Sequence, residues 1–585
     1  MPGDSAAGAV VAVRDLRKTF QRETGETVTA LDGIGFAVAP GTLAALIGPD
    51  GAGKTTLIRL LCGLMLPDDG EVEVLGQNVS AAPQEVQNVV GYMPQKFGLY
   101  EDLSVQENLD LYADLHGVTR DERAAIYPRL MEMTQLGRFR QRLAGKLSGG
   151  MKQKLGLACT LVRTPRLLLL DEPTVGVDPL SRRELWEIVT TLIEEDGLSV
   201  LVSTSYLDEA ERCDHCVVLH EGRMLAEGAP GTITAKAEGC SYIAAPPEGM
   251  PARSLQARLF ATPGVVDAVP EAGKVRVVRA TRENRAPIGI EGKEVTLKPV
   301  PARFEDGFMT VFAAVAGDSA RNTLDLRAAE EGSAEVAVEV RDLVRTFGDF
   351  TAVDRIGFQV RRGEIYGLLG PNGAGKSTTF RMLCGLLPAS AGTLHVAGAD
   401  LRTSRAEARE RLGYVAQKFS LYGDLSVDDN LRFFASAYGL RGRRRRERIA
   451  WAKDQFDLAP LATLPSRQLP GGFKQRLAMA AALLHEPQIL FLDEATSGAD
   501  PLARREFWGR ITALAESGVT VIVTTHFMEE AEYCDRIIIM DAGRALAEGT
   551  PAEVRARAGG TAATMEDAFI AIVEKARQAG ARGAA

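Results

Sequence analysis

The sequence predicts an α/β protein with two domains of the same fold in tandem and a small α+β insert after the first. At 585 residues, the chain is too long for a single hydrophobic core. The glycine-rich stretch GPDGAGKTT at residues 48–56 recurs as GPNGAGKSTT from Gly370. Lys54 and Lys376 lie 322 residues apart, and the acidic stretches that follow keep the same offset. A constant offset over several motifs indicates a duplicated domain.

Each copy begins its core with a strand, a glycine-rich turn and a helix. The apolar run at 42–48 leads into the first turn, and a helix is expected over 54–64. In the second copy the matching segments are 365–370 and 376–386. This is the context in which the motif G-x-x-x-x-G-K-[ST] indicates phosphate binding. A further apolar run at 167–170 is ended by an acidic residue and predicts a buried strand.

The insert is revealed by a break in the repeat. The stretch FEDGFMTVFA from Phe304 resembles MEDAFIAIVE from Met565, but Glu305 and Glu566 are only 261 residues apart. The first copy therefore carries about 61 extra residues, within roughly 231–303. The stretches GKVRVVRAT and KEVTLKPV predict strands there, and PARSLQARLF predicts a short helix. A spacer that props the halves apart and a regulatory module both remain open.

These observations predict the organisation of the whole chain. The predicted segments are a first nucleotide-binding domain at 1–230, a small α+β insert at 231–303, a helix and polar linker at 304–335, a second nucleotide-binding domain at 336–557, and a C-terminal helix and tail at 558–585.

Composition narrows the class of protein. The net charge of −9 argues against a protein that coats nucleic acid, which usually carries a basic surface. No apolar run approaches the ~18–20 residues that span a bilayer, and the N-terminus lacks the features of a signal peptide. The seven cysteines predict reduced thiols of a cytoplasmic protein. For Cys213 and Cys216, packed thiols are favoured over a metal clip.

The two glycine-rich loops are predicted to bind the phosphates of ATP. Glycines let backbone N–H groups approach phosphate oxygens, and the helix N-terminus adds its positive end. Lys54 and Lys376 are expected to reach the β- and γ-phosphates. The residues predicted to bind ATP in these loops are Gly48, Pro49, Asp50, Gly51, Ala52, Gly53, Lys54, Thr55, Thr56, Gly370, Pro371, Asn372, Gly373, Ala374, Gly375, Lys376, Ser377 and Thr378.

The acidic strand ends predict catalytic chemistry. Asp171 and Asp493 end apolar strands and fit a carboxylate beside Mg²⁺. Glu172 and Glu494 follow at once and are placed to orient and polarise an attacking water.

The stretches LSGGMKQK from Leu147 and LPGGFKQR from Leu469 lie between the phosphate loop and the acidic strand of each copy. With the motifs above, they make the chain resemble the ATP-binding subunits of ABC transporters over about 9–230 and 336–557. The resemblance implies that the two domains pair head to tail within one chain. The family calls the stretch that begins LSGG or, here, LPGG its signature motif. Each ATP would then be clamped between the phosphate loop of one domain and the signature motif of the other.

The resemblance also implies roles for further residues. Gln95 and Gln417 match the Q-loop, which couples the site to membrane helices, and His526 matches the switch histidine. Asp178 and Asp500 match the D-loop. The signature residues implied to contact ATP are Ser148, Gly149, Gly150, Gly471 and Gly472, and those at the adenine-stacking position are Phe20 and Phe347, for which a core or surface role stays open. The predicted Mg²⁺ ligands are Thr55, Gln95, Asp171, Ser377, Gln417 and Asp493.

The two copies differ at two chemically important positions. Ser205 stands where His526 stands in the second copy, and Pro470 stands where Ser148 stands in the first. Under head-to-tail pairing both departures fall in one site, that of Lys54. Losing one preorganised donor costs on the order of 10²–10³ in rate, so this site is predicted to be impaired and the other active. Compensation by a neighbouring N–H, with turnover at both sites, is the alternative.

The resemblance implies the motor of a type-2 ABC exporter, including drug efflux, driven by ATP and Mg²⁺. Two separate transmembrane subunits would carry the cargo, and this chain would sit at the cytoplasmic face of the plasma (inner) membrane without nucleic acid. The alternatives are a tandem ABC ATPase acting on the ribosome, which usually has a long charged helical linker, and a DNA-repair ATPase, which needs a long coiled coil. The arginine run at 441–449 is either a solvated helix face or a contact for anionic lipid or an acidic partner.

Overall fold

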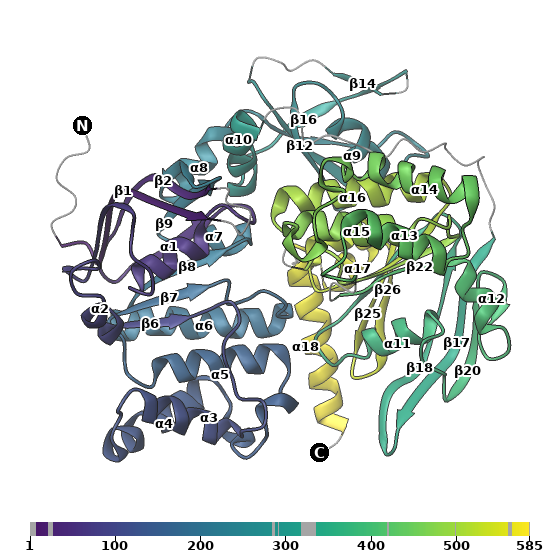
Figure 1. Cartoon of the computed structure of the whole chain (residues 1–585). Coiled ribbons are helices and arrows are strands. Elements are labelled where there is room, and N and C mark those ends of the chain that lie inside the picture. Colours follow the sequence, from purple (N-terminus) through teal and green to yellow (C-terminus); the bar gives the residue numbers. More distant parts are fainter. Residues whose placement is uncertain are drawn as a thin grey trace. The chain divides into compact units, whose positions relative to one another are not determined.

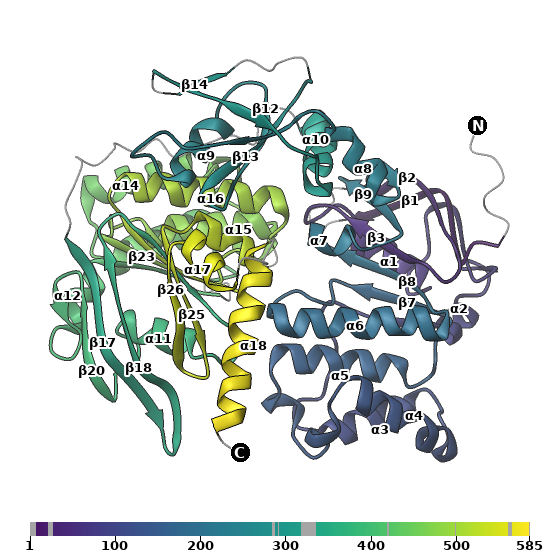
Figure 2. The ribbon, with the colours of Figure 1, turned by 180° about the vertical axis from the view of Figure 1, so that it is seen from behind.

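The computed structural model describes residues 8–21, 27–282, 287–290, 292–316, 335–417, 421–497, 499–559 and 564–583. The chain divides into two compact units (Figures 1 and 2). Unit 1 comprises Met1–Glu238 and Ala302–Val315, and unit 2 comprises Gly239–Pro301 and Ala316–Ala585. The predicted polar linker falls on 317–334, outside the described residues.

The core of unit 1 is a six-stranded sheet in the order β10-β9-β3-β8-β7-β6. All neighbours run parallel except β10, which is antiparallel at the edge. The central strands are uninterrupted apolar runs buried on both faces, as is usual for parallel sheets covered by helices. The strands are β3 (Leu43–Ile47), β6 (Val90–Met93), β7 (Leu167–Asp171), β8 (Ser199–Thr204), β9 (His215–His220) and β10 (Arg223–Gly228).

A second, antiparallel sheet of unit 1 has the order β2-β1-β4-β5 and shares one hydrophobic core with the first sheet and the helix after the phosphate loop. In both views α3, α4 and α5 lie together beyond α6 (Figures 1 and 2). These elements are β1 (Val11–Gln21), β2 (Thr27–Val38), β4 (Asp69–Val74), β5 (Gln77–Asn78), α1 (Lys54–Leu61), α2 (Pro83–Val89), α3 (Val105–Leu115), α4 (Arg120–Met133), α5 (Gly149–Leu161), α6 (Pro179–Asp196), α7 (Leu207–Ala210) and α8 (Pro230–Thr234).

Unit 2 repeats both sheets, in the orders β22-β23-β24-β19-β25-β26 and β18-β17-β20-β21, around its own core. The prediction of two tandem α/β domains is therefore confirmed. The strands are β17 (Val336–Phe347), β18 (Phe350–Arg361), β19 (Ile365–Leu369), β20 (Ala391–Val396), β21 (Ala399–Asp400), β22 (Leu412–Val415), β23 (Ile489–Asp493), β24 (Thr520–Thr525), β25 (Arg536–Asp541) and β26 (Arg544–Gly549). The helices are α11 (Lys376–Leu383), α12 (Arg405–Glu410), α13 (Val427–Ala437), α14 (Gly442–Gln455), α15 (Gly471–Ala482), α16 (Pro501–Glu516), η7 (Met528–Tyr533), α17 (Pro551–Arg557) and α18 (Met565–Gly583).

The helix expected from residue 304 is present as α10 (Phe304–Ala316) and packs on unit 1. Its aromatic side chain Phe312 lies edge-on to His220 of β9, with ring centroids 4.6 Å apart. Gly307 is needed for this approach, because a Cβ there would lie 2.1 Å from the carbonyl oxygen of Ile233. Unit 2 ends in the matching helix α18, which contacts α17 and η7.

The insert folds as a small antiparallel sheet in the order β12-β13-β11-β16, with α9 packed on it. The stretch KEVTLKPV forms two strands rather than one, so that detail of the prediction is wrong. Its first half pairs with β14 in a separate hairpin, and its second half pairs with β11. The elements are β11 (Ser241–Ala244), α9 (Ala252–Phe260), β12 (Val265–Glu271), β13 (Lys274–Arg279), β14 (Ile288–Ile290), β15 (Lys293–Val295) and β16 (Leu297–Pro299).

Although it follows the first copy in the chain, the insert packs within unit 2. Asp267 of β12 and Arg505 of α16 form an ion pair 3.4 Å apart in which each side chain is only 2% exposed. Arg253 Nε lies 2.9 Å from Asp535 Oδ1. The backbone N–H of Ala272 donates to Glu532 of η7 at 2.8 Å. The insert is thus fastened to α16 by a buried ion pair and to η7 by a more exposed hydrogen bond.

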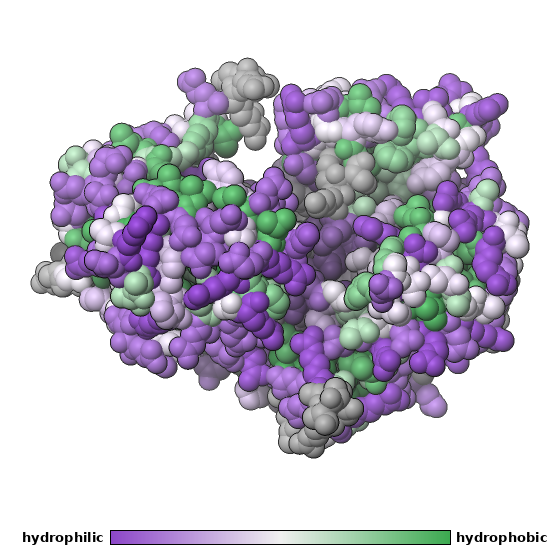
Figure 3. Space-filling view, turned by 90° about the horizontal axis from the view of Figure 1, so that it is seen from below, coloured by the Kyte–Doolittle hydropathy of each residue, from purple (hydrophilic) through white to green (hydrophobic). Residues whose placement is uncertain are grey.

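Within the described ranges, no helix combines the length and the hydrophobicity that crossing a membrane demands. Hydrophilic side chains cover most of the face seen in Figure 3, and hydrophobic ones form scattered patches.

We expect Asp267→Ala to destabilise the protein by about 3 kcal/mol, because it leaves the buried Arg505 guanidinium without this carboxylate. Chemical denaturation checks this. Arg258→Gln is the control, because the Arg258–Glu516 pair is 30% and 31% exposed, and its loss should cost less than ~1 kcal/mol. Equal losses in the two variants would contradict the assigned role of the Asp267–Arg505 pair.

Candidate nucleotide sites

Each phosphate loop lies at the carboxyl end of a central strand, between β3 and α1 in unit 1 and between β19 and α11 in unit 2. The residue before each helix is a glycine in the left-handed region: Gly53 has φ 101° and Gly375 has φ 96°. A Cβ on either would lie 2.6 Å from the carbonyl oxygen of Ala30 or Ala352, respectively. Only glycine therefore allows the loop to close over the neighbouring strand.

The loop lysines are buried with their ammonium groups inside the loops. Lys54 Nζ donates to the carbonyl oxygens of Gly48 at 2.6 Å and Pro49 at 3.2 Å. Lys376 Nζ donates to Gly370 at 2.6 Å in the same way. The carbonyls hold each cation at the mouth of the loop, where the helix N-terminus also favours an anion.

The strand-end carboxylates lie beside the loops. Asp171 Oδ1 accepts from Thr55 Oγ1 at 3.1 Å and from Ser203 Oγ at 2.6 Å. Asp493 Oδ1 accepts from Thr524 Oγ1 at 2.6 Å. Burial raises the pKa of the Asp493 carboxyl, and the Thr524 bond opposes this. A hydroxyl and a carboxylate beside a phosphate loop form the hard oxygen set that Mg²⁺ takes together with nucleotide phosphates. These residues therefore fit that ion.

The Q-loop glutamines reach the following glutamates. Gln95 Nε2 donates to Glu172 Oε2 at 2.7 Å, and Gln417 Nε2 donates to Glu494 Oε2 at 2.5 Å. Each amide oxygen takes no part in this bond and would be available to a metal ion. The structure thus brings together in each domain the loop lysine, the acidic pair and the glutamine, which are far apart in the sequence.

The two predicted catalytic glutamates have different surroundings. Glu494 Oε2 lies 3.3 Å from His526 Nδ1. Burial tends to raise the pKa of Glu494, but the His526 contact and Lys376 outweigh it and the pKa is lowered. For Glu172, burial prevails over the nearby Lys54 and the pKa is raised. The main structural difference is that the first domain has no imidazole beside its glutamate.

Both glutamates also have strained backbones. Glu172 has φ 49° and Glu494 has φ 46°, in the left-handed region that non-glycine residues seldom occupy. The N–H groups are held by the neighbouring strand, since Glu172 N donates to Ser203 Oγ at 3.0 Å and Glu494 N donates to Thr524 Oγ1 at 3.0 Å. Residues held in this sparsely populated region often lie at functional sites.

His526 presents a free ring nitrogen. Its side chain is buried, and in the described part of the chain Nε2 has no hydrogen-bond partner. A buried polar atom without a partner costs free energy unless a ligand satisfies it. Ser205, at the matching position, is also buried, but its hydroxyl stands on a single carbon and cannot extend as far.

The signature motifs begin helices. Ser148 is the N-cap of α5, and its Oγ accepts from the N–H of Met151 at 3.3 Å. Its hydroxyl proton remains for another acceptor. Pro470 is the N-cap of α15 and has no side-chain cap. The proline therefore occupies the cap itself, removing both the helix cap and the hydroxyl donor, while Gly149 and Gly471 begin the two helices.

The remaining predicted residues cap helices, lie near strand ends or are buried. Asp178 caps α6 by accepting from Ser181 N at 3.2 Å, and Asp500 caps α16 by accepting from Ala503 N at 2.9 Å. Phe20 and Phe347 are 36% and 47% exposed near the ends of long strands. The Lys18 ammonium lies 5.8 Å from the ring centroid of Phe20, and the Arg345 guanidinium lies 4.6 Å from that of Phe347. Cys213 and Cys216 are free, buried thiols, and burial raises the pKa of Cys216 to about 12. Among the described residues no cluster could hold a metal through His, Cys, Asp and Glu side chains alone.

A buried glutamate that the sequence analysis did not single out joins two parts of the second site. Glu530 accepts from Thr525 Oγ1 at 2.6 Å and from Thr496 Oγ1. Thr525 precedes His526, and Thr496 follows Glu494 by two residues. The carboxylate therefore ties the strand end that carries the histidine to the segment that leaves the catalytic glutamate. The hydroxyls at strand ends, Ser203 and Thr524 included, are the sequence signal that could have revealed such tethers.

The matching residues of unit 1 bond differently. Glu209 accepts from Thr204 Oγ1 at 2.6 Å and from the indole of Trp186 at 3.0 Å. Within the described residues the hydroxyl of Thr174 has no partner, and in unit 2 the same holds for the indole of Trp508. One set of four residues thus forms two hydrogen-bond arrangements, and only that of unit 2 includes the threonine next to the acidic pair.

We expect Thr496→Val to destabilise the protein by about 2 kcal/mol, because a buried carboxylate loses a donor, and to lower ATP turnover. Thr174→Val removes a hydroxyl that has no partner and should leave both properties nearly unchanged. Denaturation and ATPase assays of the two variants check this. Equal effects of the two substitutions would show that the tether is not specific to unit 2.

The family model described as "ABC transporter" matches residues 31–175 and 353–497, each from before the phosphate loop to beyond the acidic pair. The chain is 49% identical over 573 residues to the probable multidrug ABC transporter ATP-binding protein YbhF of Escherichia coli (strain K12), covering 97% of this chain and 98% of that protein.

Other relatives match only part of the chain. The daunorubicin resistance ATP-binding protein DrrA3 of Streptomyces coeruleorubidus is 40% identical over 42% of this chain and 77% of its own length. A solved structure of an ATP-binding subunit of an ABC transporter is 29% identical, covering 40% of this chain and 99% of that one, with a TM-score of 0.38. With two phosphate loops, two acidic pairs and near full-length similarity, the chain belongs to the ATP-binding, ATP-hydrolysing proteins of the ABC transporter family.

Proposed function

We propose that this protein is the ATPase of a type-2 ABC exporter whose transmembrane subunits are two separate chains, at the cytoplasmic face of the plasma membrane. The observation that carries the proposal is the 49% identity to a probable multidrug ABC transporter ATP-binding protein along almost the whole length of both chains. Similarity to a daunorubicin resistance ATP-binding protein favours a drug as cargo. The joining segment, which contains a β-sheet, argues against the ribosomal alternative, which usually has a long helical linker.

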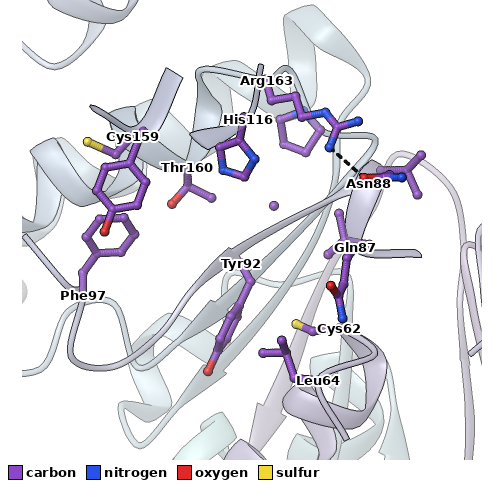
Figure 4. Close-up of a pocket in the computed structure, with 15 residues that line it drawn as sticks. Cys62, Leu64, Gln87, Asn88, Tyr92, Phe97, His116, Cys159, Thr160 and Arg163 are labelled. Carbon is purple, nitrogen blue, oxygen red and sulfur yellow. Dashed lines mark hydrogen bonds between the residues drawn. The ribbon is translucent and has the colours of Figure 1, made fainter. Parts of the chain in front are cut away.

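A pocket in unit 1 supplies a docking place for a membrane subunit. It has a volume of 230 Å³ and is lined by residues of β6, α3 and α5 and by the segment after Gln95 (Figure 4). Phe97 and Tyr112 pack against each other there with ring centroids 5.1 Å apart, and Leu64 at the rim is 53% exposed. A short apolar helix end from a membrane subunit would fill it. Because Phe97 follows Gln95 by two residues, its displacement would reach the Gln95–Glu172 bond.

In each ATP site the residues of this chain have distinct tasks. The loop lysine and backbone bind phosphate, the threonine or serine and the aspartate would hold Mg²⁺, and the ion would neutralise charge on the phosphates. The glutamate after the aspartate holds a water in line with the γ-phosphate and takes its proton. Head-to-tail pairing adds the signature serine and glycines of the other domain.

The two sites are proposed to be unequal. The site of Lys376 has Glu494 with His526 beside it, and it would receive Ser148 from the other domain. The site of Lys54 has Glu172 without an imidazole and would receive Pro470. The supporting observations are the His526–Glu494 contact of 3.3 Å and the uncapped helix at Pro470. The first site would then mainly bind ATP, and the second would hydrolyse it.

We expect Glu494→Gln to lower ATP hydrolysis by on the order of 100-fold, the contribution of a general base, and Glu172→Gln to lower it by less than about fivefold, because that site already lacks donors. Steady-state ATPase assays check this, and nucleotide binding to both variants is the control for folding. Equal losses would contradict unequal sites.

Pairing is tested by repairing the weak site. In the Glu494→Gln background, Ser205→His together with Pro470→Ser should raise ATP hydrolysis at least about tenfold, because both repairs restore donors to one site. Each repair alone should give less. If each ATP were held by a single domain, the two repairs would fall in different sites and would not act together.

Docking is tested by purification from detergent-solubilised membranes. We expect the protein to co-purify with two membrane proteins, and Leu64→Asp to lose them by placing a charge at the pocket rim. Leu115→Asp is the matched control, since Leu115 is 70% exposed and does not line the pocket. Co-sedimentation with ribosomal particles instead of membrane proteins would favour the alternative function.

A further inference from the structure

Helix α14 of unit 2 begins with a run of arginines. Its N-cap is Arg441, its first residues after Gly442 are four consecutive arginines, Arg443 to Arg446, and its first turn contains no acidic residue. The side chains of 441, 443, 444 and 446 are exposed, and that of 445 is half-buried. This is a dense positive patch on a chain with a net charge of −9.

The patch works against the stability of the helix. The N-terminus of an α-helix carries the positive end of its dipole, so cations there are unfavourable and acidic residues favourable. The matching helix α4 of unit 1 follows the favourable rule: Thr119 and Glu122 form a capping box, and Asp121 lies in its first turn. Arg441 gives no side-chain cap. The second copy therefore has a positively charged helix start where the first copy has a stabilised one, which favours a binding role for these arginines over a stabilising role.

The rest of the helix is anchored independently of the patch. Arg448 donates to the carbonyl oxygens of Leu483 at 2.9 Å and Leu484 at 3.0 Å, at the end of α15. Its guanidinium also stacks on Trp451, 3.9 Å from the ring centroid, and Ala452 is fully buried. These contacts hold the C-terminal half of α14 against unit 2, so the basic start is presented outward on a fixed support.

The charge of the patch is only partly neutralised within the chain. Arg443 pairs with Glu447 and Arg444 pairs with Glu486. Over the part of the chain that the structure describes, Arg441, Arg445 and Arg446 take part in no ion pair. Three guanidinium groups within about one and a half helical turns thus remain for an external anion.

We propose that the N-terminal arginines of α14 bind the anionic phospholipid surface of the membrane that carries the transporter. This rests on the proposed function for the presence of a bilayer nearby. Guanidinium groups bind phosphate in bidentate geometry, and each basic residue near an anionic leaflet adds to membrane affinity. A run of about one and a half helical turns is too short to follow a nucleic-acid backbone. The contact would hold unit 2 at the membrane beside its transmembrane partner.

The test is flotation of the full-length protein with vesicles of phosphatidylcholine, alone or with about a third phosphatidylglycerol. We expect binding only to the anionic vesicles, weakened by high salt. Replacing the four consecutive arginines by glutamine should reduce the bound fraction at least about tenfold. Replacing them by lysine should preserve most of it. The glutamine variant should not unfold more easily, because the substitution removes repulsion with the helix dipole.

The matched control removes four exposed arginines from other elements of both units: Arg14, Arg341, Arg355 and Arg402, all changed to glutamine. It lowers the net charge equally and should retain vesicle binding. Equal loss in this control, unchanged binding of the α14 variant, or binding of RNA in place of anionic vesicles would overturn the proposal. The proposed function is tested separately, because co-purification with membrane proteins through the Leu64 pocket does not involve α14.

Discussion

The nucleotide sites of both domains depend on one constraint, a carboxylate buried at the end of a central parallel strand. Asp171 is 1% exposed and Asp493 is 6% exposed, and a charge in such a place must be hydrogen-bonded. The hydroxyl of Ser203 or Thr524 on the neighbouring strand meets this need. The same hydroxyl receives the N–H of the next residue, which fixes the strained backbone of the glutamate. The pairing of these two strands therefore determines the position of both the aspartate carboxylate and the glutamate backbone.

Duplication has left this centre intact and varied what surrounds it. The sheets, the phosphate loops and the acidic pairs are repeated, whereas His526 is exchanged for Ser205 and the cap Ser148 for Pro470. Neither exchange lies in the hydrophobic cores, so neither threatens the fold. The hydrogen bonds of the buried carboxylates Glu209 and Glu530 also differ between the two copies. Glu209 accepts hydrogen bonds from Thr204 and Trp186, whereas Glu530, close to the strand that ends before His526, accepts them from Thr525 and Thr496.

The two copies also differ in elements away from the central sheets, namely the insert and helix α14. The insert follows unit 1 in the chain but is anchored on α16 and on η7, the segment that begins two residues after His526. Any movement of η7 during the nucleotide cycle would therefore also move the part of the insert that is bonded to it. Helix α14 differs in another way: its first turn has arginines and no acidic residue, so its start is less stable but positively charged. Both elements lie outside the hydrophobic cores around the central sheets, so they can differ in function without loss of the fold.

The sequence by itself determined the duplicated α/β fold, the phosphate loops, the acidic strand ends and the two departures, because each is a local pattern whose chemistry depends on neighbouring residues. It also predicted the helices at Ala252–Phe260 and from Phe304, but it missed the division of one insert stretch into two strands and the buried Glu530. Only the tertiary structure decided which unit the insert packs on, that Gln95 and Gln417 face the glutamates, and that Thr496 but not Thr174 is tethered. The reason is physical: these contacts join residues tens to hundreds of positions apart, and geometry between distant strands and helices, not local sequence, selects each donor for a buried carboxylate.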